Sequence, residues 1–153
     1  MNQNTSESTL DQAIESFWES VPPVWHFIRG QVHVIASEQF NLSVDYYHIL
    51  RRIRQGSHSV SDLATDFQIS RSAISQSVDL LVEKGLVTRT EQVKDRRFVQ
   101  IELTPDGDTL LNAIFKQNRA WMKTKMVRLT EEELLTIQKA MVLLKNTFIE
   151  NKD

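Results

Sequence analysis

The residues best suited to chemistry lie in one short charged segment, where Lys94, Arg96 and Arg97 surround Asp95. Lysine and arginine bind phosphate oxygens, and arginine also enters narrow minor grooves of DNA. A carboxylate is unexpected beside phosphates, so we interpret Asp95 as a brace that holds the arginine-bearing turn by an ion pair. The alternative is a solvent-exposed turn with an incidental ion pair, which would contribute little. The pattern favours a nucleic-acid contact.

The segments that flank this charged tip alternate with a period of two. Leu86, Thr88 and Thr90 share one phase before the tip, and residues 99, 101 and 103 are apolar after it. Such alternation on both sides of a polar turn predicts two antiparallel strands joined as a hairpin.

The segment before the hairpin predicts a helix from Arg71 to Lys84, with Ser70 as its N-cap and Gly85 as its stop. Ile74, Val78 and Leu81 would anchor the helix to the core. The opposite face offers Arg71, Ser72, Ser75, Gln76 and Asp79, and the first four of these could reach base edges or phosphates in a major groove. A solvated helix face is the simpler alternative.

Two more helices are expected before this one, over Val44–Gln55 and Ser61–Phe67, with Gln68 and Ile69 forming the turn. Two short helices, a tight turn and a hairpin predict a mainly α fold with a small β-hairpin, the winged helix-turn-helix. We expect it over residues 43–104. A flexible tail (1–9) and an amphipathic helical region (10–42), kinked at Pro22-Pro23, would precede it, and two helices (105–153) would follow.

The net charge does not indicate a nucleic-acid partner, but the distribution of charge along the chain agrees with one. The chain of 153 residues has a net charge of -2, but residues 47–97 hold nine basic and six acidic side chains, whereas the remainder holds nine and fourteen. No cysteine is present, so disulfides and thiolate metal sites are excluded. We also expect no membrane span and no secretory signal, and hence a cytoplasmic protein.

Enzymatic motifs are missing from the sequence. No nucleophile motif, phosphate loop or convincing carboxylate pair occurs, and the four histidines have no metal-site spacing. We therefore expect neither an enzyme nor a metal or other cofactor.

The wing segment resembles the MarR family of bacterial transcription regulators. Asp95-Arg-Arg97, five residues, then Leu103-Thr104 is similar to the family pattern D-x-R-x5-L-T, and Leu63-Ala64, Ile74-Ser75 and residues 80–87 are also similar. The resemblance implies a homodimer whose first and last helices form the dimer interface. It also implies a repressor that binds double-stranded DNA at a palindromic operator. Arg97 takes the place of the wing arginine, and Lys94 and Arg96 would contact phosphate.

The resemblance further implies release of DNA by a small aromatic or phenolic effector. The residues that could line its pocket are Trp18, Trp25, His26, Arg29, His33, Tyr46 and Tyr47. Aromatic side chains at helical spacing are more often core residues, and this alternative stays open. Two other functions also stay open. One is a winged-helix module for protein association without DNA binding, and the other is a small-molecule carrier or enzyme.

Overall fold

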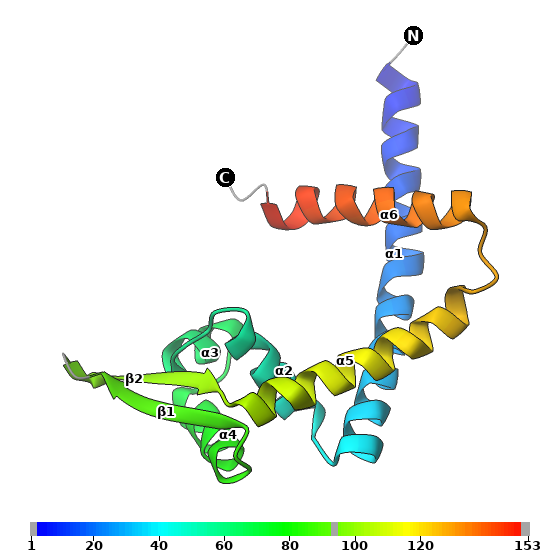
Figure 1. Ribbon diagram of the computed structural model, residues 1–153. Coiled ribbons are helices and arrows are strands. Elements are labelled where there is room, and N and C mark those ends of the chain that lie inside the picture. The colour runs from blue at the N-terminus through cyan, green and yellow to red at the C-terminus, as the bar shows by residue number, and fades with distance from the viewer. Residues whose placement is uncertain (1–2, 93–94, 151–153) are drawn as a thin grey trace. The chain divides into compact units, whose positions relative to one another are not determined.

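The computed structural model describes residues 3–92 and 95–150, and the side chains of residues 8–90 and 99–149. The chain forms two compact units, Met1–Asn118 and Arg119–Asp153 (Figure 1). The first unit contains the helix-turn-helix and the hairpin.

The helix-turn-helix is built from α2 (Val44–Arg54), α3 (Val60–Phe67) and α4 (Arg71–Glu83). A serine caps each helix: the side chains of Ser43, Ser59 and Ser70 each accept a hydrogen bond from the backbone N–H three residues further on, at 3.3, 3.0 and 3.2 Å. Gln68 ends α3 in the left-handed conformation, with φ of 54°. The predicted cap at Ser70 and the predicted turn at Gln68 and Ile69 are confirmed.

The hairpin consists of β1 (Val87–Gln92) and β2 (Asp95–Leu103), which pair in antiparallel fashion with Val87 opposite Leu103 and an irregularity between Glu91 and Gln92. β2 begins at Asp95 and not near Phe98, so residues 95–97 belong to the strand and not to a turn. The Ile101 N–H also donates to the His58 carbonyl at 2.8 Å, which ties the α2–α3 loop to β2.

One apolar core holds these elements together. Ile74, Val78 and Leu81 of α4 are completely buried, as predicted, and Ile101 of the hairpin and Leu50 of α2 are completely buried as well. The remaining buried side chains come from the turn that follows α1, the loop before α2, and α2, α3, β1 and α5: Ile35, Ala36, Leu42, Tyr47, Ile49, Ile53, Leu63, Ala64, Val87, Leu111 and Ile114.

The first helix, α1 (Gln3–Val34), continues into a π-helical turn over Ile35–Gln39. It begins at Gln3 and not near Leu10, so helix covers most of the segment expected to be a tail. It also passes through Pro22 and Pro23 without a break. Both prolines are exposed, so water can bind the carbonyl groups that they leave without a backbone donor.

The hairpin is joined to α5 (Pro105–Met126) by a close backbone junction. The Thr104 hydroxyl donates to the Gly85 carbonyl at 2.6 Å and accepts from the Gly107 N–H at 3.0 Å. A Cβ on Gly107 would overlap the carbonyl oxygen of Leu86. The connection between α4 and β1 is therefore in direct contact with the start of α5 at the base of the hairpin.

The second unit consists of the end of α5, α6 (Glu131–Lys145) and a π-helical turn over Asn146–Glu150. Thr130 and Glu133 form a capping box at the start of α6. None of the residues of α6 is buried, and its apolar side chains include the exposed Met141, Val142 and Leu143. Among the residues described, no helix is long and apolar enough to cross a bilayer.

Candidate nucleic-acid interface

The outer face of α4 presents polar side chains to solvent. Arg71, Ser72 and Gln76 are exposed in its first two turns, and Ser75 is half-buried. Ile74 and Val78 hold the opposite face in the core. The structure thus brings the four predicted residues of α4 together on its accessible side, where the helix N-terminus also favours anions.

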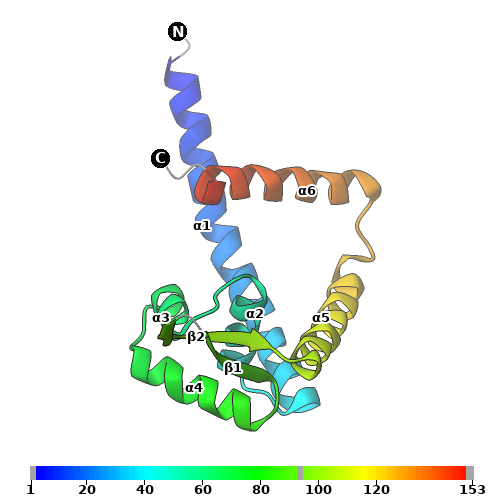
Figure 2. The same cartoon turned by 60° about the vertical axis from the view of Figure 1, so that its left-hand side comes forward.

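The hairpin lies alongside α4 in both views of the molecule (Figure 1, Figure 2). Of the predicted tip residues, Lys94 lies outside the described residues. Asp95, Arg96 and Arg97 are described as part of β2, but their side chains are not. The proposed ion pair between Asp95 and Arg97 therefore stays a prediction.

Arg89 on β1 connects the hairpin to α4, and the sequence analysis gave it no role. Its Nη1 lies 2.7 Å from Oδ1 of Asp79, and its Nη2 donates to both the backbone oxygen and the hydroxyl oxygen of Ser75, each at 3.2 Å. Ser75 and Asp79 are four residues apart and so share one face of the helix. Nothing in the local pattern of residues 86–91 specifies this partner.

Arginines of α2 make contacts inside the domain. Arg54 donates to Asn112 of α5 at 2.8 Å and lies 3.6 Å from Asp108. Arg52 lies 4.0 Å from Asp66, which also accepts a hydrogen bond from Ser57 at 2.5 Å. These contacts hold α2 against α3 and α5, so part of the basic charge in residues 47–97 is internally paired.

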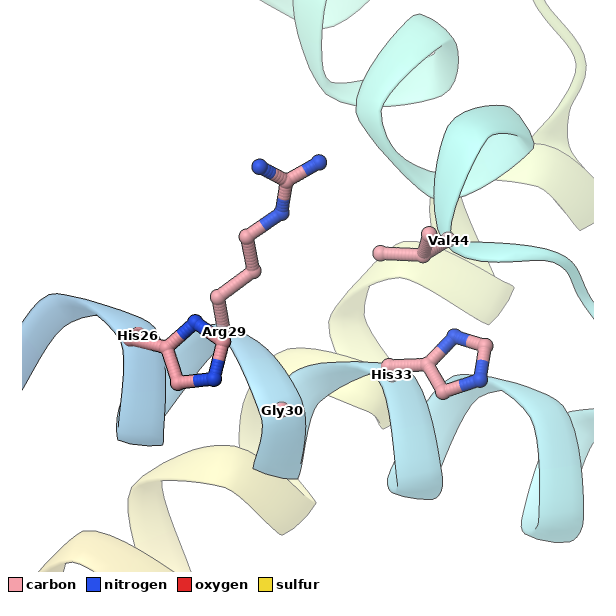
Figure 3. Close-up of a pocket in the computed structure, with 5 residues that line it drawn as sticks. All are labelled: His26, Arg29, Gly30, His33 and Val44. Carbon is pink, nitrogen blue, oxygen red and sulfur yellow. The ribbon is translucent and has the colours of Figure 1, made fainter.

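A shallow pocket of about 280 Å³ lies between α1 and the start of α2, lined by His26, Arg29, Gly30, His33 and Val44. Figure 3 shows His26 beside Arg29, and His33 next to Val44. Among the residues predicted for an effector pocket, His26, Arg29 and His33 thus lie together.

The predicted aromatic residues lie elsewhere. Trp18 and Trp25 are exposed on α1 and do not line this pocket, whereas Tyr47 is buried in the core, 5.4 Å from the ring of His48. Tyr46 is half-buried on α2 and is not a lining residue either.

The charge near the pocket is positive. Burial lowers the pKa of His48, and the neighbouring Arg51 and Arg29 lower it further, against the opposing effect of Asp45. The Arg51 guanidinium also lies 5.8 Å from the centre of the Tyr47 ring. An anion would be stabilised in these surroundings. Among the described side chains, no group of three metal-ligating residues lies together.

Comparison with known proteins identifies relatives along most of the chain. A family model described as "MarR family" matches residues 42–99. The HTH-type transcriptional repressor MdtR of Bacillus subtilis is 35% identical over 127 residues, which cover 83% of this chain and 82% of MdtR.

Solved structures share the fold. A MarR family protein from Bacillus stearothermophilus is superimposed with a TM-score of 0.78 at 15% identity, over 90% of this chain and 96% of the other. A mutant of MepR from S. aureus, bound to an oligodeoxyribonucleotide, gives a TM-score of 0.65 at 20% identity, over 86% and 96% of the two chains. At these identities the likeness concerns the fold.

Proposed function

Because this chain is a member of the MarR family of transcription regulators, we propose that it binds duplex DNA as a homodimer and represses transcription from a palindromic operator. MdtR is a transcriptional repressor, which supports repression as the outcome. The MepR mutant is bound to an oligodeoxyribonucleotide, which supports DNA as the partner. The proposal places the protein in the cytoplasm, with the chromosome, and assigns it no catalytic step.

One observation carries the DNA proposal, namely the exposed polar face of α4 beside the hairpin. Figure 2 shows the hairpin alongside this helix. An α-helix fits the major groove, and side chains of its first turns reach base edges. In this proposal Gln76 reads a base, Arg71, Ser72 and Ser75 contact phosphates or bases, and the wing residues Lys94, Arg96 and Arg97 contact the backbone and minor groove. Asp95 braces Arg97.

The dimer proposal rests on apolar side chains that the single chain leaves exposed. On α1, Leu10, Ile14, Trp18 and Trp25 are each between 47% and 67% exposed, and α6 also presents apolar side chains. Exposed apolar surface on this scale is typical of an interface. A two-fold symmetric dimer would place two α4 helices to match the two halves of a palindrome.

A fluorescence anisotropy titration with labelled duplex at low and moderate salt tests the DNA proposal. Arg97→Ala should weaken binding to all sequences and reduce the salt slope by roughly one unit. Gln76→Ala should change preference at one base pair, by about 1–3 kcal/mol. The absence of salt-dependent binding at micromolar protein would contradict DNA binding and favour a protein-association module.

The pocket between α1 and α2 supports the proposed effector. Arg29, His26 and His33 provide cationic and hydrogen-bonding groups, and the volume of about 280 Å³ suits a small aromatic acid. An effector that binds better to a dimer whose winged domains no longer match the operator would release DNA by population shift.

Benzoate serves as the probe of this site, with benzylamine, of similar size and opposite charge, as the control. Benzoate should lower the affinity of the protein for its duplex, benzylamine should not, and Arg29→Ala should abolish the difference. Equal effects of the two compounds would refute an anion site at Arg29.

A further inference from the structure

We propose that Arg89 is a positioning residue for DNA recognition. Its ion pair with Asp79 and its hydrogen bonds to Ser75 hold the β1–β2 hairpin against α4, in the orientation that allows the helix and the hairpin to bind DNA together. The proposal rests on the DNA-binding function proposed above. It assigns a role to three residues of which only Ser75 was expected to be functional.

The Arg89 guanidinium contacts α4 at two residues, Asp79 and Ser75. One guanidinium nitrogen of Arg89 lies 2.7 Å from Asp79, and the other donates to two oxygens of Ser75. A planar guanidinium that uses both nitrogens fixes direction as well as distance, which a lysine ammonium does not do. The side chain of Arg89 is 29% exposed, so water competes only partly for these contacts.

A contact with α4 is needed to fix the orientation of the hairpin. A two-stranded hairpin is marginally stable by itself, and its orientation is set by what its base touches. The connection from α4 passes through Gly85, whose φ of +70° is the left-handed conformation that glycine adopts readily. Val87 anchors β1 in the core two residues further on, and the Arg89 side chain contacts α4 two residues beyond Val87.

The same contact explains a charge that is otherwise unfavourable. The Asp79 side chain is 55% exposed on the helix that the proposed function places against DNA. An unpaired carboxylate there would repel phosphates and weaken binding. If its purpose is to hold Arg89, removal of the carboxylate should weaken DNA binding, although the protein becomes less negative.

Glu83 offers a matched control. It is an exposed acid on the same helix, and no ion pair of it is found among the described side chains. Glu83→Ala removes the same charge as Asp79→Ala, without the contact to Arg89. Any general electrostatic gain should therefore appear in both variants.

The experiment measures the Kd for one duplex at several salt concentrations for the wild type, Asp79→Ala, Glu83→Ala, Arg89→Ala and the Asp79→Ala/Arg89→Ala double variant. Thermal denaturation of each establishes that the Kd is measured on folded protein. We expect Asp79→Ala and Arg89→Ala each to raise the Kd by about three- to tenfold, as for the loss of a partly exposed charge-assisted contact. The double variant should be no worse than Arg89→Ala, and Glu83→Ala should leave the Kd equal or lower.

Three outcomes would overturn the proposal while DNA binding by the wild type stands. Asp79→Ala could have the same Kd as Glu83→Ala, which would show that the contact between Arg89 and Asp79 does not affect DNA binding. The variants could lose thermal stability with unchanged Kd, which would make the contact purely stabilising. Arg89→Ala could lower the salt slope by about one unit, which would make Arg89 a direct phosphate contact. A wild type that binds no DNA would instead overturn the proposed function, and this inference with it.

Discussion

Replacement of Gly107 by alanine should destabilise the junction between the hairpin and α5. Gly107 lies in the first turn of α5, and a Cβ there would overlap the Leu86 carbonyl oxygen far inside van der Waals contact. The atom it meets is backbone, so no side chain can rotate away. Relief requires α5 to move away from Leu86, in the connection between α4 and β1.

The magnitude follows from two costs and one gain. Overpacking of this kind costs about 1–3 kcal/mol. Movement of α5 also strains the hydrogen bond from the Thr104 N–H to the Leu86 carbonyl, of 3.1 Å, and such a bond contributes about 1 kcal/mol. Alanine regains about 1 kcal/mol as the better helix former. The net loss is therefore about 1–3 kcal/mol, or roughly 3–10 °C in Tm for a chain of this size.

Thermal unfolding followed by circular dichroism measures this loss, at equal protein concentration because a dimer's Tm depends on it. Gly30→Ala is the matched control, since Gly30 lies inside α1 and a Cβ there meets nothing within 4 Å. That variant should gain about 0.5–1 kcal/mol. If both variants shift the Tm in the same direction by the same amount, the steric reasoning at Leu86 is wrong.

Three further predictions concern capping, pH and assembly. Ser70→Ala removes the acceptor for the Ala73 N–H and should cost about 1 kcal/mol of stability in urea unfolding, with Ser70→Asp as the control that retains a cap; an unchanged midpoint would contradict the capping role. Because the pKa of His48 in the folded protein is below its usual 6.5, the unfolded chain binds more protons, so stability should fall as the pH drops below about 6.5; His48→Gln should lessen that fall, and an identical pH profile would refute the assignment. Trp18→Glu places a charge on an exposed apolar position of α1 and should shift the protein from dimer to monomer in light scattering after gel filtration, whereas Asp11→Glu should not; a Trp18→Glu dimer would exclude this part of α1 from the interface.

The elements of the helix-turn-helix could be predicted because their signals are local. A serine before each helix, a glycine after α4 and the spacing of Ile74, Val78 and Leu81 all act within a few residues of chain. The continuity of α1 could not be predicted in the same way. The effect of Pro22-Pro23 depends on whether solvent reaches the neighbouring carbonyl groups, which is a property of the folded chain.

The details of the candidate site depend on tertiary contacts. Charge counting marked Arg89 as basic, but only the folded hairpin brings it to Asp79 and Ser75, which are 10 and 14 residues away along the chain. Tyr47 is the opposite case. The sequence predicted it as a pocket residue, whereas its position on α2 places it in the core. Aromatic content alone does not separate a binding wall from an interior.

The hydrogen bond from Ile101 to the carbonyl of His58 also bears on aggregation. A strand edge with free backbone groups can pair with the edge of another chain, and such pairing propagates into fibres. Here the His58 carbonyl in the α2–α3 loop accepts the Ile101 N–H of β2 at 2.8 Å, near the base of the hairpin. That part of the sheet is thereby closed to strand addition, and a protein that must stay dispersed while it exposes a hairpin gains protection from a single backbone contact.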